Sequence, residues 1–121
     1  MTFTLFVPCQ LWTCNAERRM HHHKRANLVR PARQAAELLT RNKQADPMVQ
    51  PVTVDFYPYQ ANRGVLADTA GHMPPCKAVL DGCVDAGLLE DDTPEFVVSQ
   101  TFHPPQKSKV TGVRIVIRPV I

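Results

Sequence analysis

Short segments in which hydrophobic and polar residues alternate set the strongest limit on what this chain can fold into. A period of two places one set of side chains on one face of a β-strand, so each segment predicts a half-buried strand. Such strands are expected around Phe3, Leu5 and Val7, around Val52, Val54 and Phe56, and around Val113, Ile115 and Ile117. A further strand is expected around Phe96, Val98 and Phe102.

Two other segments have the period of an amphipathic helix. The first carries a stripe of Leu28, Ala32, Ala35 and Leu39, and we expect a long helix that begins near Glu17 and is kinked at Pro31. The second follows Pro74 and Pro75, which suit a helix N-terminus, and ends at Gly87. Its hydrophobic side is formed by Cys76, Leu80, Cys83, Val84 and Gly87, flanked by Val79, and its other side by Lys77, Asp81 and Asp85.

The element order β-α-β-α-β-β predicts an α+β fold with a small mixed sheet and two main helices. The chain has 121 residues, of which 44% are hydrophobic, so we expect residues 1–121 to form one domain with its own core. No apolar run approaches the ~18 residues of a membrane span, and the first residues lack the features of a secretory signal. We therefore expect a cytoplasmic protein that has no membrane partner.

The four cysteines are expected to be reduced, because a chain without an export signal and with an adequate core does not need disulfides. Cys76 and Cys83 are expected to pack in the core, and the other two are Cys9 and Cys14. A zinc-binding module built from all four is an alternative. The spacings C-x4-C and C-x6-C are wider than the close pairs of structural zinc sites.

Basic and acidic residues are separated along the chain. Residues 17–43 hold eight Lys and Arg against two Glu, whereas residues 81–95 hold six carboxylates and neither Lys nor Arg. Two solvated surfaces would give this pattern, and so would a metal-dependent enzyme that acts on a polyanion. Composition alone does not decide between the two.

The acidic stretch lies toward the end of the second helix and beyond it, where the helix dipole makes each carboxylate unfavourable by ~0.3–1 kcal/mol. If the stretch is partly enclosed it needs a cation, and no arginine lies nearby in the sequence. Carboxylate oxygens are ligands that Mg²⁺ and Mn²⁺ prefer. The six residues are Asp81, Asp85, Glu90, Asp91, Asp92 and Glu95.

The segment KAVLDGCVDAGLLEDD resembles the signature of the RusA-type Holliday-junction resolvases, a family of small dimeric, Mg²⁺-dependent endonucleases of phages and prophages. That signature runs D-x-D-N-x-x-K-x-x-x-D-x-L, a short helix, Gly, and a pair of aspartates. It is matched without a gap by Lys77, Asp81, Gly87, Asp91 and Asp92. Weaker similarity extends over nearly the whole chain. The resemblance implies a homodimer that resolves four-way junctions and other branched DNA, in the host cytoplasm if a phage encodes it.

The chain departs from the signature before the lysine. The candidate for the first aspartate is Asp68, nine residues before Lys77 and three further than in the signature, and the second aspartate is missing. His72 stands near the expected asparagine, either as a substitute ligand or as an ordinary loop histidine. The departure keeps open an alternative, a non-catalytic DNA-binding protein with the same fold and a degenerate metal site.

The resemblance implies a role for each matched residue. Asp68, Asp91 and Asp92 would hold Mg²⁺, with Mn²⁺ as a substitute, and would be catalytic together with Lys77. Lys77 would offset charge on the phosphate or orient the attacking water. Asp81 would support the site, or would simply form an i,i+4 ion pair with Lys77.

The basic segment supplies the expected contacts to DNA backbone phosphates. The three histidines of MHHHKR are expected near phosphates or solvent rather than on a metal. Trp12 is expected in the core, with stacking on an exposed base as the alternative. The expected phosphate-binding residues are Arg18, Arg19, Lys24, Arg25, Arg30 and Arg33.

Overall fold

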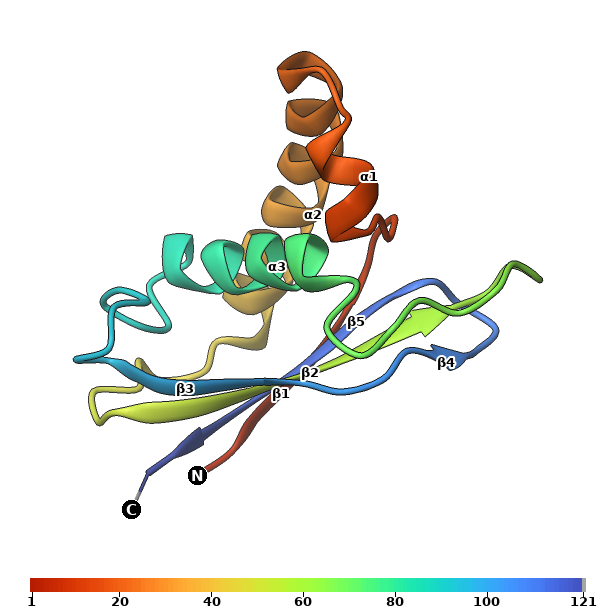
Figure 1. The fold of residues 1–121 in the computed structure, drawn as a ribbon. Helices are drawn as coiled ribbons and strands as arrows, with labels where there is room; N and C mark the ends of the chain where they lie inside the picture. The colour runs from red at the N-terminus through yellow and green to blue at the C-terminus, as the bar shows by residue number, and fades with distance from the viewer. Residues whose placement is uncertain (121) are drawn as a thin grey trace.

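The structure is a computed structural model that describes residues 1–120. It has the predicted α+β fold, with helices packed on a five-stranded mixed sheet (Figure 1). The elements in chain order are β1 (Phe3–Pro8), α1 (Cys14–Arg18), α2 (His22–Lys43), β2 (Val52–Gln60), α3 (Met73–Asp85), β3 (Val97–Phe102), β4 (Gln106–Lys107) and β5 (Gly112–Pro119).

The sheet has the strand order β1-β5-β2-β3, and the short β4 pairs with the end of β2. Strand β5 is antiparallel to both of its neighbours, β1 and β2. Strands β3 and β4 run parallel to β2. Parallel neighbours need a crossover connection, and α3 provides it between β2 and β3. This crossover places α3 and the acidic stretch that follows it over one face of the sheet.

The helices cover only one face of the sheet (Figure 1). The inward side chains of the three alternating strands are buried there, so the half-buried strands predicted from the sequence are confirmed. On the uncovered face, Tyr57 of β2 lies between an arginine and a histidine. The guanidinium of Arg114 is 4.4 Å from the centre of its ring, and the ring of His103 stacks on it at 4.2 Å.

Strand β3 differs from the predicted pattern. Val97 is buried beside Val52, but Val98 is 55% exposed, because a β-bulge shifts the register after the first pair. Beyond the bulge Phe102 is opposite Phe56, and their rings stack at 5.0 Å. The predicted strand is present but begins at Val97, and the bulge breaks its period of two.

The predicted single helix from Glu17 is two helices. Helix α1 ends at Arg18, and α2 begins at His22 and contains Pro31. The buried positions of α2 are Ala32, Ala36 and Thr40, one residue away from part of the predicted stripe. The small side chains at these positions let α2 lie close to α3.

Helices α2 and α3 are in tight contact at Gly82. A Cβ atom there would overlap the carbonyl oxygen of Arg33 and lie 2.6 Å from the Cβ of Ala36. Cys83, the next residue, is buried, and its sulfur accepts a hydrogen bond from Thr40 Oγ1 at 3.4 Å. Cys76 is also buried, and all four cysteines are free, which confirms the predicted packing role of the two on α3.

Helix α3 ends as predicted. Gly87 has φ of 87°, a left-handed conformation that favours glycine. Its amide bonds the carbonyl of Val84, and the amide of Leu88 bonds the carbonyl of Cys83. These bonds satisfy carbonyls at the end of the helix and turn the chain back along α3.

Candidate functional site

The turn after α3 brings two residues of the resemblance into contact. Lys77 Nζ donates a hydrogen bond to Asp92 Oδ2 at 3.0 Å, across 15 positions of the sequence. Leu88 and Leu89 are buried, and the Leu88 carbonyl accepts a bond from Met48 N at 2.8 Å, which anchors the returning segment. Both charged side chains keep about a third of their surface exposed, at 36% and 31%. The pair is therefore held by the fold and open to solvent.

The two adjacent aspartates have different environments. The hydrogen bond from Lys77 holds the pKa of Asp92 below its ordinary value. Asp91 is exposed, and its Oδ1 accepts a bond from the Asp92 backbone N–H at 2.8 Å. Asp91 thus fixes the backbone at Asp92, and Asp92 faces the lysine.

Asp81 lies near the same lysine without forming the predicted i,i+4 ion pair. Asp81 forms an ion pair with Arg33 instead, with 3.9 Å between Arg33 Nη1 and Asp81 Oδ2. Burial raises the pKa of Asp81, the nearby charges of Asp92 and Asp85 raise it further, and Lys77 and Arg33 oppose them. The predicted i,i+4 ion pair between Lys77 and Asp81 is wrong, because Lys77 bonds Asp92 instead. Lys77, Asp81 and Asp92 form one charged cluster, here called the Lys77 cluster.

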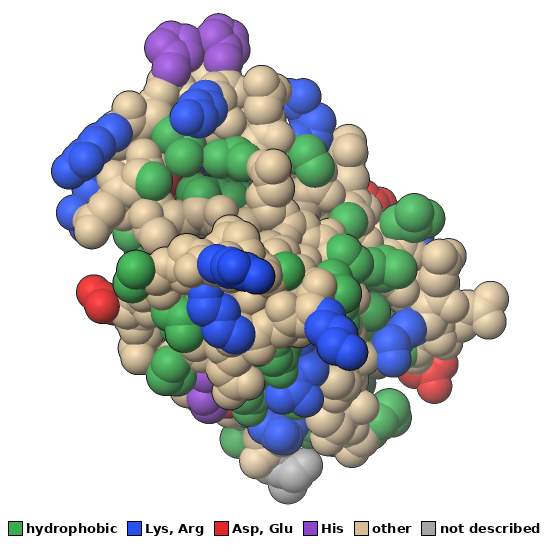
Figure 2. Space-filling view, turned by 90° about the vertical axis from the view of Figure 1, so that its right-hand side faces the viewer, with side chains coloured by type: hydrophobic (Ala, Val, Ile, Leu, Met, Phe, Trp, Pro, Cys, Tyr) green, Lys and Arg blue, Asp and Glu red, His purple; other side chains and the backbone are tan. Residues whose placement is uncertain are grey.

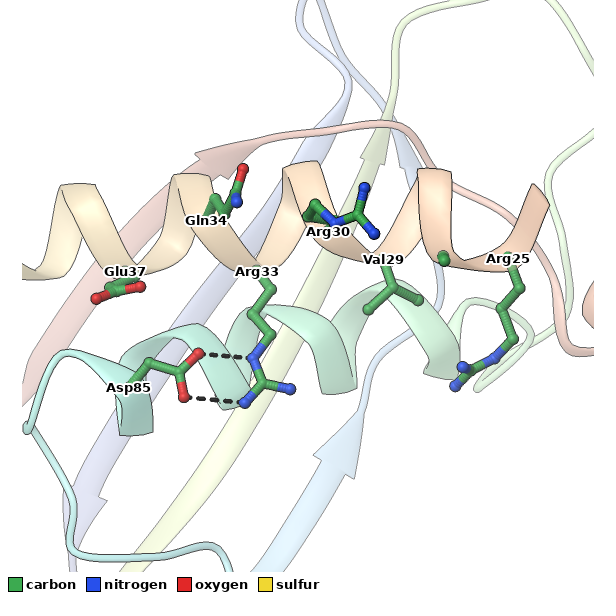
Figure 3. Close-up of a pocket in the computed structure, with 8 residues that line it drawn as sticks. Arg25, Val29, Arg30, Arg33, Gln34, Glu37 and Asp85 are labelled. Carbon is green, nitrogen blue, oxygen red and sulfur yellow. Dashed lines mark hydrogen bonds and ion pairs between the residues drawn. The ribbon is translucent and has the colours of Figure 1, made fainter. Parts of the chain in front are cut away.

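Helix α2 supplies the cation that the acidic stretch needs. Arg33 forms two hydrogen bonds with the carboxylate of Asp85, at 2.6 and 2.9 Å (Figure 3). This contact lowers the pKa of Asp85. Arg41 adds a bond of 3.1 Å to the Asp85 carbonyl. Neither partner could be identified from the sequence, because they lie 52 and 44 residues away.

The three predicted metal ligands are not brought together. Asp68 lies in the loop before α3 and lines a separate hollow of about 360 Å³ with Cys14 and Asn15. Within residues 1–120, Asp68, Asp91 and Asp92 do not form a group whose ligand atoms all lie within 4.8 Å. The carboxylate that joins Asp92 is Asp81.

His72 is not an ordinary loop histidine. It is 6% exposed, directly precedes α3, and its Nδ1 lies 3.1 Å from the backbone oxygen of Trp12. Trp12 itself is 5% exposed, which confirms the predicted core position. The Trp12 Nε1–H donates to Glu17 at 2.7 Å.

All the residues predicted to bind phosphates are exposed on or beside α1 and α2. Three of them line a groove of about 430 Å³ along α2, namely Arg25, Arg30 and Arg33. Figure 3 shows that Arg33 points toward Asp85. Arg25 lies 3.4 Å from Glu17, so two of the three already have an acidic partner. Arg30 has no ion pair within the described residues.

Three exposed histidines gather at the N-terminus of α2, at the top of Figure 2. The ligand atoms of His21, His22 and His23 lie within 4.8 Å of one another, the only such group of three His, Cys, Asp or Glu in residues 1–120. They adjoin Lys24 and the positive end of a helix dipole, which disfavours a cation. The zinc module predicted as an alternative from four cysteines has no counterpart among the described residues.

Comparison of the chain with models of known protein families gives no match, and comparison with curated protein sequences gives none either. Within residues 1–120, none of the helices is both long enough and apolar enough to span a membrane.

Proposed function

We propose that the protein is a Mg²⁺-dependent endonuclease that cuts branched DNA, with its active site at the Lys77 cluster. The observation that carries the proposal is the contact of 3.0 Å between Lys77 and Asp92. It joins the lysine and the second of the paired aspartates, the two ends of the segment that resembles the resolvases. Asp81, which matches the same signature, lies beside them.

The donor set fits Mg²⁺, but with a different composition from the predicted one. Mg²⁺ commonly binds through one or two carboxylates and takes its remaining oxygens from water and substrate phosphate. Asp81 and Asp92 supply two carboxylates, and a DNA phosphate would supply more oxygen. When bound, the ion would lower the pKa of a water and stabilise charge on the leaving oxygen. Asp68 and Asp91 are assigned no direct contact with it.

The protein groups have separate tasks in this proposal. Lys77 Nζ would move from Asp92 to a phosphate oxygen and offset its negative charge. Asp81 would hold the ion together with Asp92 through its carboxylate. Asp91 would keep the backbone of Asp92 in place through its bond of 2.8 Å.

The exposed basic residues of α1 and α2 would bind phosphates on either side of the cut. These contacts fix the position of the protein without reading bases. A homodimer would bring two Lys77 clusters to two strands of a four-way junction. Its location would be the cytoplasm, or the host cytoplasm if a phage encodes it.

The test is cleavage of a labelled four-way junction in Mg²⁺, beside a gel-shift assay in Ca²⁺. Asp92→Asn should reduce the cleavage rate by roughly 100-fold or more, as expected for loss of a group that acts on the reacting atoms. It should leave binding unchanged or slightly tighter, since a negative charge near the phosphate is removed. Asp46→Asn is the matched control, because Asp46 is exposed in the loop before β2. Equal cleavage by wild type and Asp92→Asn would overturn the assignment.

A DNA-binding protein without cleavage is the second candidate. It is favoured by the separation of Asp68 from Asp92 and by Lys77, which already neutralises one of the two remaining carboxylates. Wild-type protein that shifts the junction in a gel but does not cut it in Mg²⁺ or Mn²⁺ would establish this function instead.

A further inference from the structure

A cavity of about 740 Å³ lies at the opposite end of α3 from Asp85. It is open to solvent on one side and lined by the loop after β1, the first turns of α2, and the adjoining ends of β2 and β5. Its volume is within the range of ~300–1,000 Å³ that is usual for small-molecule sites. On the face drawn in Figure 2, hydrophobic side chains lie in a hollow beneath the histidines, with Lys and Arg side chains on either side.

The lining of the cavity has hydrophobic and polar side chains but no Lys, Arg, Asp or Glu. Trp12, Met20 and Leu28 form hydrophobic parts of the wall. The indole N–H of Trp12 is already bonded to Glu17, so toward a ligand Trp12 offers only ring surface. A charged ligand would find no counter-ion in this lining to offset the water that it loses on binding. The cavity therefore suits a neutral ligand with a hydrophobic face.

One buried polar atom of the lining has no partner. His72 is 6% exposed, and its Nε2 has no hydrogen bond within the described residues. Its Nδ1 faces the Trp12 oxygen at 3.1 Å, and an oxygen of this kind only accepts. In the neutral ring Nδ1 therefore carries the proton, and Nε2 is left as an acceptor. Buried acceptors are seldom left unpaired, and His72 belongs to the lining of the cavity, so a donor that a ligand brings next to this ring would pair with Nε2.

Three other polar side chains of the lining each keep a hydrogen-bonding group that is free to contact a ligand. Both amide hydrogens of Gln60 are used, toward Asn62 Oδ1 at 2.7 Å and Gly64 O at 2.9 Å, which leaves its carbonyl oxygen as an acceptor. Asn62 Oδ1 accepts this bond, so its amide nitrogen remains a donor. Thr111 Oγ1 accepts from Ala61 N at 2.9 Å and keeps its own hydrogen to donate. Together with His72 these side chains offer two acceptors and two donors, and the amide of Gln10 adds both kinds of group.

We propose that this cavity binds a nucleobase, a neutral flat heterocycle whose edge carries both N–H donors and acceptors. Aromatic and aliphatic side chains would contact its faces, and the polar groups would bond its edge, as in pockets that receive an unstacked base. The base has two sources, a free nucleoside or an unpaired base of a DNA strand. Only the second source rests on the proposed function.

Trp12 is the only tryptophan of the chain, and it lines the cavity, so its fluorescence reports occupancy. We expect a saturable change in Trp12 emission when adenosine or cytidine is titrated into the full-length protein. His72→Asn should weaken binding roughly tenfold, since it removes one hydrogen-bond acceptor. The asparagine amide can still donate to the Trp12 oxygen, so the fold should survive. His22→Asn, the same change at an exposed histidine, should have no effect.

A parallel arm uses two DNA hairpins, one with a single unpaired adenine in its stem and one fully paired. Saturation by the nucleosides supports a free-nucleoside site. Saturation by the unpaired hairpin, with the paired hairpin and the nucleosides inactive, supports a base within a strand. No response to any of these probes would overturn the proposal, and so would equal affinity of folded His72→Asn and wild type. If His72→Asn fails to fold, Thr111→Val replaces it, with the same expected loss. The nucleoside arm needs no cleavage, so its failure is distinct from failure of the endonuclease proposal.

Discussion

The two ends of α3 contact different parts of the protein, one mainly through buried packing and the other mainly through charge pairs. At the first end, His72 and Trp12 are nearly inaccessible to solvent, and the cavity beside them has no charged side chain in its lining. Along the rest of the helix, Lys77, Asp81 and Asp85 are partly exposed and matched by charges from other segments. Burial defines the first region and charge pairing the second. Stability should therefore depend mostly on the first, and response to pH and salt mostly on the second.

The largest effect is expected from removing the buried ring at the cavity. Trp12→Ala should lower the free energy of unfolding by about 3 kcal/mol, because the ring packs against Ala32 and Ala78 and a void would replace it. Urea unfolding followed by circular dichroism measures the loss. Trp12→Phe keeps a ring and should lose less. A loss below ~1 kcal/mol for the alanine variant would show that the cavity wall contributes no more than a surface contact.

The corresponding change in the charged region should cost less. Arg33→Ala should lower stability at pH 7 by at most about 1 kcal/mol, since the side chains of Arg33 and Asp85 are 46% and 31% exposed and solvent screens their attraction. The pKa of Asp85 is lowered, so this stabilisation is complete above the ordinary aspartate pKa of ~3.9 and is lost as the pH falls through the folded-state pKa.

The difference between wild type and Arg33→Ala in urea unfolding should therefore shrink steadily below pH ~4. Arg30→Ala is the control, because Arg30 has no ion pair in the part of the chain that is described. A difference that stays constant from neutral to acid pH would mean that Arg33 acts through packing rather than charge.

A smaller effect of opposite sign is expected at Asp81. Burial raises its pKa, so its charged form is disfavoured by folding, and the penalty appears as the pH rises above the ordinary aspartate range. Asp81→Asn should raise stability at pH 7 by up to about 0.5 kcal/mol, a value reduced because 34% of the side chain is exposed to solvent. The gain should vanish in acid. Lower stability of Asp81→Asn at pH 7 would mean that its attraction to Arg33 outweighs burial. On the proposed function, the same variant loses cleavage activity.

The smallest expected effect separates two neighbouring arginines in DNA binding. If about six phosphates are neutralised, the slope of log K against log salt should be near −5. Arg30→Ala should reduce it by roughly one unit. Arg33→Ala should change it less, because this side chain is already bonded to Asp85. Gel-shift titrations at several salt concentrations provide the slopes. An unchanged slope in both variants would remove α2 from the DNA interface.

Local patterns determined much of the fold. The alternation at Phe3, Leu5 and Val7 and in the other two clear strands predicts which side chains are buried, because the period of a strand depends only on backbone geometry. The proline pair before α3 and Gly87 after it likewise predict the bounds of that helix, since each fixes or frees the backbone locally. The bulge at Val98 was not predictable, because it depends on how β3 pairs with β2.

The sequence alone also identified Lys77 and Asp92 as candidate site residues, through a resemblance that spans a continuous segment. Only the tertiary structure decided which other residues lie next to them. Asp81 lies near Lys77 and Asp92, whereas Asp68 lines a separate hollow. Arg33 of α2 forms an ion pair with Asp85. The partners of a charge or a buried nitrogen such as His72 Nε2 come from segments far away in the chain. Coulomb attraction and hydrogen bonding act over a few ångströms of space, so packing rather than sequence distance determines which groups meet.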